Sequence, residues 1–339
     1  MAPLASVIIL NYNGLKFVER CVRSVLKTDY PNFEVIFVDN GSSDGSNELV
    51  KKLFGSDPRL IFIENSRNMG YSDGNNEALR YAKGKVIVFL NNDTVVDKRW
   101  LRNLIITMEN DAQVGAARCN IVDAYYNKLG YSIGHTINIL GYGYPMYEKG
   151  KKNDEGYIKE IPFAESVALA IKNSVISEVS FNNYKLFDSD YFIYYDDTDV
   201  SWRIKLRGYK IIVVSSSSVR HFGTFIGRMS PRMIFLFAKN RITTLLKNYN
   251  TINMLKYVPL LLIFDLARAI ILIKNKKLSY SFAILLAIWW NLRNLKKIWI
   301  KRSVVQRLIR KYPDSHVMTH MVRFDPVILY SNFKKVYLD

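Results

Sequence analysis

The sequence predicts an α/β protein whose mostly parallel sheet carries helices on both faces, followed by a basic helical region. Three observations predict this arrangement. Short apolar runs alternate with helix-like stretches over the first hundred residues, the charge is divided unequally along the chain, and two long apolar stretches come late. Short β-branched runs bounded by polar turns are typical of buried parallel strands, and successive strand–helix units are typical of doubly wound sheets.

The first hundred residues supply the elements of this sheet. Four strands are expected, at Val7–Leu10, Val35–Val38, Leu60–Ile63 and Val86–Leu90. Three helices are expected between them, at Leu15–Leu26, Ser46–Phe54 and Ser72–Ala82. A chain of 339 residues has room for one large domain with an appendage or for two domains. We expect one domain over residues 1–230 and a helical region over residues 231–339.

Polar turns follow each of the four expected strands. They are Asn11-Tyr12-Asn13, Asp39-Asn40-Gly41, the segment 65–73 and Asn91-Asn92-Asp93. The carboxyl ends of parallel strands share one edge, where ligands of such sheets bind. Any one of these turns is explained by turn-forming residues alone, but four on one edge favour a site for a polar ligand. Neither a GxGxxG fingerprint nor a GxxxxGK[ST] loop is present.

Charge separates the two halves of the chain. Residues 201–339 contain 26 Lys and Arg against 4 Asp and Glu, a net +22, whereas residues 1–200 contain 22 against 26, a net −4. Such asymmetry indicates a polyanionic partner, either nucleic acid or an anionic membrane. Cys21 and Cys119 are far apart and form no CxxC pattern, which suits a reducing compartment and indicates no thiolate metal site.

The C-terminal region contains two apolar stretches, Tyr257–Ile273 and Leu278–Leu292, separated by a lysine-rich turn. Neither reaches the ~20 clean apolar residues of a spanning helix, and Asp265 and Arg268 interrupt the first. A basic amphipathic helix is expected after them, and its apolar face consists of Ile300, Val304, Val305, Leu308 and Ile309. Helices of this kind lie in the membrane interface. A spanning hairpin and ordinary packing helices remain the alternatives.

Carboxylates at two places in the sequence indicate metal binding or catalysis. Asp93 follows a buried strand, where a divalent cation held by a carboxylate offsets the charge of a diphosphate. Asp196, Asp197 and Asp199 crowd three carboxylates into four residues, an arrangement that favours a cation, a shared proton or a general base. A helix-capping Asp and an acidic helix start are the structural alternatives. His221 becomes a candidate metal ligand if it lies near such a site.

Four ordered motifs resemble the inverting family 2 glycosyltransferases of GT-A fold, most of all their rhamnosyltransferase-like branch of cell-surface polysaccharide synthesis. These motifs are SVIILNYNG, EVIFVDNGSSDGS, NMGYSDGNNEALRYAKGKVIVFLNNDT and YYDDTDVSWRIKLRGYK. The resemblance covers roughly residues 5–225. It implies a GT-A, Rossmann-like domain with a nucleotide-sugar half over about residues 1–115 and an acceptor half over about 116–230. The basic C-terminal stretch resembles the membrane-proximal tail of that branch less specifically.

The resemblance implies a role for each matching residue. Asp197 is the expected catalytic base, Asp93 the metal-binding carboxylate and His221 a second metal ligand. The nucleotide-sugar is expected to lie against Asn11, Asn13, Asp39, Asn68, Gly70, Asp73, Asn91 and Asn92. Supporting or acceptor-side positions are Asp196, Asp199, Trp202 and Arg203. Two positions depart from the family pattern: Asn91 replaces the first carboxylate of its DxD motif, and Asp196 replaces a Glu.

The expected function is therefore that of a metal-dependent hexosyltransferase that uses Mg²⁺ or Mn²⁺ and works by single displacement. The expected partners are a nucleotide-sugar donor, a lipid-linked or saccharide acceptor, and an anionic membrane surface on its cytoplasmic side, held peripherally or monotopically. A sugar nucleotidyltransferase is a rival, although Asn11-Tyr12-Asn13-Gly14 is not its Gly-rich, basic loop. A nucleic-acid-binding protein is another rival because of the +18 net charge, although the basic residues interleave with apolar stretches.

Overall fold

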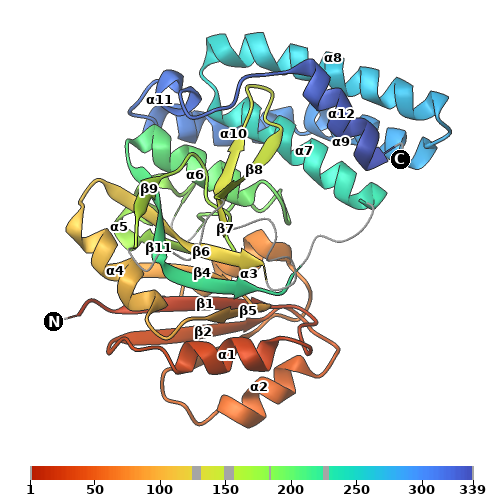
Figure 1. Cartoon of the computed structure of the whole chain (residues 1–339). Coiled ribbons are helices and arrows are strands. Elements are labelled where there is room, and N and C mark those ends of the chain that lie inside the picture. Colours follow the sequence, from red (N-terminus) through yellow and green to blue (C-terminus); the bar gives the residue numbers. More distant parts are fainter. Residues whose placement is uncertain (1, 124–130, 149–155, 183–184, 224–228, 338–339) are drawn as a thin grey trace.

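The first four strands and three helices form where the sequence predicts them. The computed structural model describes residues 2–123, 131–148, 156–182, 185–223 and 229–337. Parallel strands lie in the order β3-β2-β1-β4, with bounds Leu60–Glu64, Phe33–Asp39, Ala5–Asn11 and Val86–Asn91 (Figure 1). The helices between them are α1 (Val18–Leu26), α2 (Ser46–Phe54) and α3 (Gly70–Leu79). The prediction of an α/β sheet is confirmed.

The sheet continues beyond β4 with mixed pairing. Its order there is β10 (Ala168–Lys172), β6 (Val114–Asp123), β11 (Lys210–His221) and β5 (Thr94–Val96). Of these neighbours only β6 and β11 run parallel to each other. A hairpin of β7 (Tyr131–Ile137) and β8 (Gly143–Glu148) extends from β6, and β9 (Ile158–Glu160) pairs with β11. The helices of this half are α4 (Trp100–Asn110), α5 (Asn173–Val179) and α6 (Asp196–Arg207).

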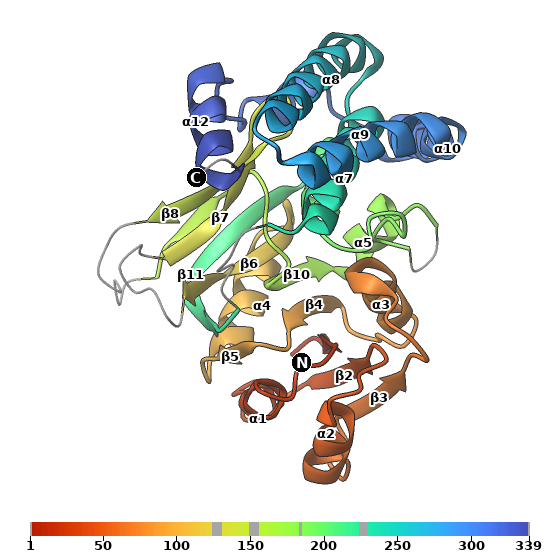
Figure 2. The same cartoon turned by 90° about the vertical axis from the view of Figure 1, so that its right-hand side faces the viewer.

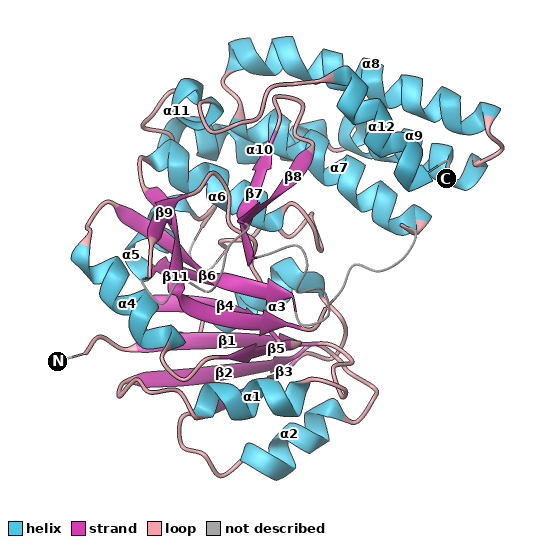
Figure 3. Ribbon diagram, viewed as in Figure 1, coloured by secondary structure: helices cyan, strands magenta, loops and turns pink. Residues whose placement is uncertain are grey.

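Both faces of the sheet are covered, as Figure 3 shows. Alternate residues of one strand point to opposite faces, and along β1 Ile8 belongs to one buried cluster while Val7 and Ile9 belong to the other. The cluster of Val7 and Ile9 includes residues of α1 and α4, whereas that of Ile8 includes residues of α6 and of the C-terminal helices. The continuous apolar runs of the strands reflect this double cover.

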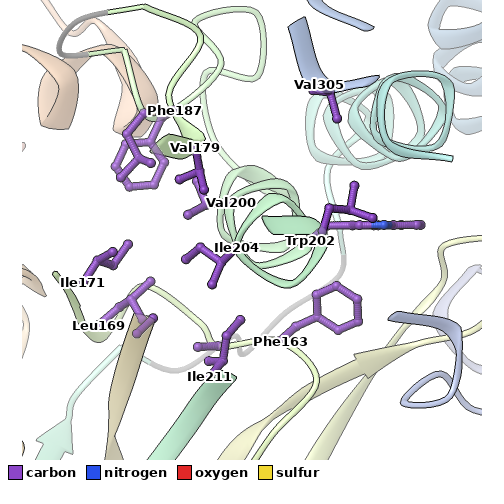
Figure 4. Close-up of a cluster of buried hydrophobic side chains, with 14 of the residues drawn as sticks. Phe163, Leu169, Ile171, Val179, Phe187, Val200, Trp202, Ile204, Ile211 and Val305 are labelled. Carbon is purple, nitrogen blue, oxygen red and sulfur yellow. The ribbon is translucent and has the colours of Figure 1, made fainter. Parts of the chain in front are cut away.

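Helix α6 lies at the centre of the larger cluster. Val200, Trp202 and Ile204 project from it among side chains of several other elements (Figure 4). Trp202 is fully buried and makes edge contacts with Phe163 and Tyr249, at centroid distances of 6.1 and 4.9 Å. Packing on this scale fixes α6 in rotation and position. Since Asp196 and Asp197 open this helix, the cluster determines where their carboxyl groups lie.

The C-terminal region consists of helices gathered at the end of the molecule remote from α1 and α2 (Figures 1 and 2). They are α7 (Pro231–Asn248), α8 (Thr251–Lys274), α9 (Leu278–Arg293), α10 (Leu295–Val304), a π-helical turn (Val305–Ile309), α11 (Asp314–Met318) and α12 (Pro326–Tyr337). Ser230 and Asn250 cap α7 and α8, since each side chain accepts a hydrogen bond from a first-turn backbone N–H. None of the helices described combines the length and the apolar character that crossing a membrane requires.

The expected apolar face of the helix around residue 305 is wrong in part. Val305 and Ile309 are buried in the core, whereas Ile300 and Leu308 are exposed. At about 100° per residue, side chains at these spacings spread over half of the helix circumference, and the core takes one part of that arc. The sequence pattern identified an amphipathic helix, but it assigned both the core-facing and the exposed side chains to one surface.

Candidate active site

Asn11 joins the ends of three neighbouring strands at the polar edge of the sheet. Its fully buried amide donates hydrogen bonds to Asp39 Oδ1 at 3.0 Å and to Ser46 Oγ at 2.8 Å, and its Oδ1 accepts one from Asn92 Nδ2 at 2.7 Å. A Cβ at Gly14 would lie within 2.3 Å of Asn11 and Asn92, so glycine is required there. The structure therefore brings three predicted site residues together.

The neighbouring turn is ordered by Asn40, which is almost fully buried. Its Nδ2 donates to Asn68 Oδ1 at 3.1 Å, and its Oδ1 accepts from the Met69 backbone N–H at 3.1 Å. Gly70 has φ +79°, and a Cβ there would lie 2.5 Å from Phe192. Asp73 accepts a 2.5 Å hydrogen bond from Ser189 Oγ. The segment Asn68–Asp73, which includes the first turn of α3, is thus in contact with the segment that precedes Asp196.

Two further predicted residues lie on this edge. Asn13 is exposed, takes a left-handed φ of 50°, and accepts a hydrogen bond from the Ser43 backbone N–H at 2.9 Å. Asn91 ends β4 and donates its backbone N–H to Val167 O at 3.0 Å. The four turns after β1 to β4 therefore form one polar edge, as the order of parallel strands requires.

Asp93 and His221 are far apart in sequence and adjacent in the structure. Strand β5 pairs with the end of β11, which sets His221 opposite Thr94, and the Phe222 backbone N–H donates to Asp93 O at 2.8 Å. His221 Nε2 consequently lies 3.2 Å from Asp93 Oδ1, and both side chains are about one-fifth exposed. The structure supplies a carboxylate and an imidazole pointing at one another at the rim of the polar edge.

The residues around Asp93 fit a divalent cation that phosphate oxygens would help to coordinate. Asp93 Oδ1 is buried and accepts no hydrogen bond, and its one polar contact among the described residues is the 3.2 Å approach of His221 Nε2. A Cβ at Gly223 would lie 2.2 Å from Asp93 Oδ2 and 2.8 Å from His221 Nε2, so the glycine leaves these ligand atoms uncovered. Within the described ranges no three His, Cys, Asp or Glu side chains gather as a complete metal site. Carboxylate and imidazole with open positions suit Mg²⁺ or Mn²⁺ bound together with a diphosphate.

The loop before Asp196 is strained. Phe192, Tyr194 and Tyr195 all have positive φ, at 66°, 73° and 63°. Left-handed conformations are unfavourable for bulky residues and persist only where the surroundings enforce them. The ring of Tyr194 stacks on Phe237 of α7 at a centroid distance of 4.3 Å. The chain passes through these residues into α6, whose first turn carries Asp197.

Asn240 of α7 holds this strained loop. Its fully buried Nδ2 donates to the backbone carbonyls of Tyr191, Ile193 and Tyr194 at 3.1, 2.9 and 2.8 Å. A single side chain therefore satisfies three carbonyls that a loop of this shape leaves without partners in a sheet or helix. The sequence prediction missed Asn240, because an isolated Asn in a helix carries no local signal of contact with a loop 46 to 49 residues away.

Asp197 lines a pocket of about 420 Å³ between the sheet and the C-terminal helices. Its lining includes His135 of β7, Thr198 of α6 and Glu165. The opposite wall, from α7, α8 and α12, consists of Phe237, Arg241, Arg268, Leu329 and Phe333. Thr198 links two of these groups, since its backbone N–H donates to Asp197 Oδ1 at 2.7 Å and its hydroxyl lies 2.9 Å from His135 Nε2. The wall residues were not predicted.

The surroundings of Asp197 make it a stronger base than an ordinary carboxylate. Removal from water raises its pKa; the positive charge of His135 opposes this shift, and Glu165 adds to it. Burial and the charge of Asp197 raise the pKa of Asp196 well above its usual range. Asp196 is buried, whereas Asp197 is half-buried and is the one of the two that lines the pocket. Of the adjacent pair, Asp197 has the position of a general base.

Two arginines that line the pocket, Arg241 and Arg268, are paired with one buried carboxylate. Arg241 donates to both oxygens of Asp265 at 2.7 and 2.8 Å, and Arg268 donates to Asp265 at 3.0 Å. Arg241 also lies 3.8 Å above the ring of Tyr142. The interruption that Asp265 and Arg268 make in the apolar sequence is thus explained: both face the pocket side of α8 in a buried ionic cluster.

Asp199, Trp202 and Arg203 support α6 from the interior and do not line the pocket. Asp199 is fully buried, at 3.0 Å from Arg203 and 3.1 Å from Lys247 of α7. The positive charges of Lys247 and Arg203 overcome burial, and the pKa of Asp199 is lowered. Arg203 also donates to the backbone carbonyls of Val179 and Leu186, and none of these three residues is among those that line the pocket. Their supporting role stays a prediction.

Replacing Asn240 by Ala is expected to slow turnover more than it weakens donor binding. The change removes the side-chain donor of the Ile193 and Tyr194 carbonyls, at a cost of about 1–3 kcal/mol for each group left unsatisfied, while the Tyr191 carbonyl keeps the Ile193 backbone N–H at 2.8 Å. The loop then relaxes and Asp197 leaves its position. We expect the turnover number to fall at least tenfold, with donor affinity nearly unchanged, in steady-state kinetics and calorimetry.

Asn291→Ala is the matched control. Asn291 of α9 is also buried and donates to two carbonyls, those of Lys239 and Ala287, at 3.1 and 2.9 Å, but it does not touch the loop. Both variants are expected to melt at lower temperature. If Asn291→Ala lowers the turnover number of the folded protein as much as Asn240→Ala does, the loop contacts of Asn240 are not what positions Asp197.

Comparisons with known proteins agree with this geometry. Residues 6–171 match the family model "Glycosyl transferase family 2". The chain is 26% identical over 197 residues to Glycosyltransferase GlyG of Streptococcus pneumoniae, an alignment of 56% of this chain and 64%, less than two thirds, of that relative.

Solved structures show the same fold. The mannosyltransferase PcManGT of Pyrobaculum calidifontis in complex with GDP-Man and Mn²⁺ superposes with a TM-score of 0.54 at 19% identity, covering 90% of this chain and 86% of that one. S. aureus TarS 1-349 in complex with UDP-GlcNAc gives 0.56 at 15% identity, covering 89% and 90%. Identities this low bear on the fold alone. The family match over residues 6–171 and the shared fold agree with a glycosyltransferase of family 2.

Proposed function

We propose that this protein transfers a sugar from a nucleotide-diphosphate-sugar to an acceptor hydroxyl, with inversion at the anomeric carbon. The observation that carries the proposal is the position of Asp197. This carboxylate has a raised pKa and lines a pocket. The segment that precedes it contacts Asp73, which lies beside the polar edge of the sheet. The family match and the nucleotide-sugars in the structures of PcManGT and TarS support a donor of this class.

The polar edge would hold the donor. Asn11, Asp39 and Asn92 form a rigid hydrogen-bonded floor at the ends of β1, β2 and β4, which favours a ligand placed in one orientation. The loop from Asn68 to Asp73 borders the same edge and touches the segment that leads to Asp197. The donor's anomeric carbon would then lie between the polar edge and the pocket.

Transfer would be a single displacement. Asp197 accepts the proton of the acceptor hydroxyl as its oxygen forms a bond to the anomeric carbon, and the bond from that carbon to the diphosphate oxygen breaks. Asp93 and His221 would hold Mg²⁺ or Mn²⁺, which neutralises charge on the departing nucleoside diphosphate. Burial and the charge of Asp197 raise the pKa of Asp196, so the adjacent pair Asp196 and Asp197 favours a single negative charge, on Asp197.

We further propose a lipid-linked saccharide as acceptor and the cytoplasmic face of a membrane as the place of action, in the synthesis of a cell-surface polysaccharide. The helices that wall the pocket opposite Asp197 belong to the basic C-terminal region. Cys21 and Cys119 are buried free thiols, which agrees with a reducing compartment.

A donor screen tests the proposed function. The full chain is offered UDP-, GDP- and dTDP-sugars with and without Mn²⁺ or Mg²⁺, while binding is followed by calorimetry and nucleoside diphosphate release is followed with water or a saccharide as acceptor. We expect one nucleotide to bind, with turnover that requires metal. Release of pyrophosphate from a nucleoside triphosphate and a sugar 1-phosphate would support a nucleotidyltransferase instead. Failure of every donor to bind would refute the proposal.

A further inference from the structure

The outer side of α8 is an exposed apolar stripe. Its members recur every three to four residues, with one gap of eight, on the side opposite the buried residues of the helix: Ile252, Leu255, Ile263, Leu266, Ile270 and Ile273. Ile252 is 77% exposed and Ile263 is 62% exposed. Apolar side chains that cluster on one helix face without a covering element mark an interaction site.

A second stripe runs along α9 and α10. It follows a spacing of three and four residues over most of its length: Leu278, Phe282, Leu285, Trp289, Leu292, Leu295, Trp299 and Ile300. Phe282 is 67% exposed, and Trp289 and Trp299 are each about half exposed. The α10 end of this stripe borders a shallow groove of about 420 Å³ lined by Trp299, Ile300 and Lys296. We call the two stripes together the docking face.

The charges around the docking face are of one sign. Residues 251–311 contain thirteen Lys and Arg and one acidic residue, Asp265. Asp265 is fully buried in its cluster with Arg241 and Arg268, so it contributes no negative charge to the surface. Lys274 and Lys276 in the turn between α8 and α9 are exposed, as is Lys296 of α10. Exposed apolar stripes bordered by basic residues complement a surface that is apolar inside and anionic at its rim.

We propose that the docking face binds an anionic lipid bilayer, with α8, α9 and α10 lying in its interface and not crossing it. Tryptophan is the residue that prefers the headgroup level of a bilayer, and Trp289 and Trp299 are placed for it on the outer side of the α9–α10 stripe. The helices form the end of the molecule remote from α1 and α2, so the sheet does not obstruct their approach to a flat surface (Figures 1 and 2).

Helix α8 separates the docking face from the pocket of Asp197. Arg268 lines the pocket, whereas Leu266 and Ile270, two positions to either side of it, are exposed in the stripe. A rotation of about 100° per residue sets these two about 160° from Arg268, on the other side of the same helix. The pocket therefore lies about one helix diameter, ~10 Å, from the bilayer surface. An acceptor with an anchor in the bilayer and a saccharide outside it fits this distance, a conclusion that rests on the proposed function.

Vesicle sedimentation of the full chain tests the docking face. The probes are vesicles of phosphatidylcholine alone and vesicles with one-third phosphatidylglycerol, at low and at physiological salt, without donor or acceptor. We expect the wild type to sediment with the anionic vesicles. The triple variant Phe282→Ser, Trp289→Ser, Trp299→Ser should bind them at least about tenfold more weakly. The triple variant Lys274→Gln, Lys276→Gln, Lys296→Gln should lose the preference for anionic lipid.

The matched control removes exposed apolar side chains of other faces. Leu53 of α2, Ile106 of α4 and Ile158 of β9 are 40%, 50% and 61% exposed, similar to the substituted residues of α9 and α10. The triple variant of these three to Ser should sediment with anionic vesicles as the wild type does. Donor hydrolysis in the absence of vesicles should be equal in all four proteins, which separates failure of membrane binding from failure of the proposed function.

Three outcomes overturn the proposal. The first is a wild type that stays in the supernatant with both vesicle compositions and at both salt concentrations. The second is retention of a DNA duplex without vesicle binding, which assigns the basic surface to nucleic acid. The third is a stable dimer that the aromatic-to-Ser variant dissociates and that vesicles leave intact, which assigns the docking face to a second copy of the chain.

Discussion

Asp197→Asn is expected to lose nearly all transfer while still binding the donor. The amide keeps the shape of the carboxylate and can accept the backbone hydrogen bond from Thr198, but it cannot accept the proton of a sugar hydroxyl. Removing a positioned general base typically costs about 10²–10⁴-fold in rate. In the proposed function the donor contacts lie on the polar edge of the sheet, so affinity for the nucleotide-sugar should stay within a few fold. Product formation and calorimetric donor binding measure the two effects separately.

The pH profile of the wild type provides a second readout of the same role. Asp197 acts as a base only when ionised, and burial together with Glu165 raises its pKa, against the opposing effect of His135. Transfer should therefore fall as the pH drops through this raised pKa, at a higher pH than the usual value of 3.8 would give. His135→Gln removes the opposing positive charge, so the acidic limb should move to still higher pH.

Glu178→Gln is the control for the carboxylate-to-amide change. Glu178 of α5 pairs with Arg207 at 2.6 Å, away from the pocket, and this change should leave transfer nearly intact. Asp199→Asn is expected to lower the melting temperature as well as the rate, since Lys247 and Arg203 lose a buried partner charge. If Asp197→Asn transfers at near the wild-type rate while Asp196→Asn is inactive and folded, the base lies on the other carboxylate.

Asp93→Ala is expected to abolish the stimulation of turnover by metal. Charge stabilisation by a bound metal is worth several kcal/mol, or about 10²–10³-fold in rate or more. With Asp93 gone, His221 remains as the single ligand of the pair, so Mn²⁺ binding in the presence of a nucleoside diphosphate should weaken sharply. Electron paramagnetic resonance of Mn²⁺ reports that binding without reference to activity.

Two further variants test whether the effect of Asp93→Ala comes from loss of the metal site. Asp97→Ala removes an exposed carboxylate that follows β5 at its other end, and it should bind Mn²⁺ as the wild type does. Gly223→Ala keeps both ligands but sets a methyl group 2.2 Å from Asp93 Oδ2, so it should weaken Mn²⁺ binding although no ligand has been removed. Full activity of Asp93→Ala at saturating Mg²⁺ or Mn²⁺ would exclude Asp93 from the mechanism.

Much of the nucleotide-side half of the fold could be predicted because its signals are local. The apolar runs of β1 to β4 and the turn residues after them lie within a few positions of each other, and parallel pairing then gathers Asn11, Asp39 and Asn92 on one edge. The neighbourhood of Asp93 and His221 required the pairing of β5 with β11, which no local pattern indicates. The expectation that Asp93 and His221 act together came from the resemblance to a family, because their positions in the sequence do not indicate contact.

The pocket side could not be predicted, because its residues come from elements distant in sequence. Asn240 and Arg241 lie in a helix whose sequence shows only amphipathic packing. Asp265 and Arg268 are recognisable in the sequence as charges within an apolar stretch, but the sequence does not indicate which side of α8 they face. Trp202 and Arg203 adjoin the acidic cluster in sequence, yet helix rotation turns them into the interior. Proximity along the chain is a poor guide to proximity around a helix.

The contact between Asn240 and the strained loop has a consequence for the order in which the protein is synthesised. The sheet that would hold the donor is complete once β11 has been made, but the loop before Asp196 is held by a helix that the ribosome produces later. The nascent chain would therefore complete the polar edge of the sheet before the loop that positions Asp197 is held in place. On the proposed function, a polypeptide that stalls near residue 230 would bind a nucleotide-sugar without hydrolysing it, because Asn240, which holds the loop before Asp196, has not yet been made.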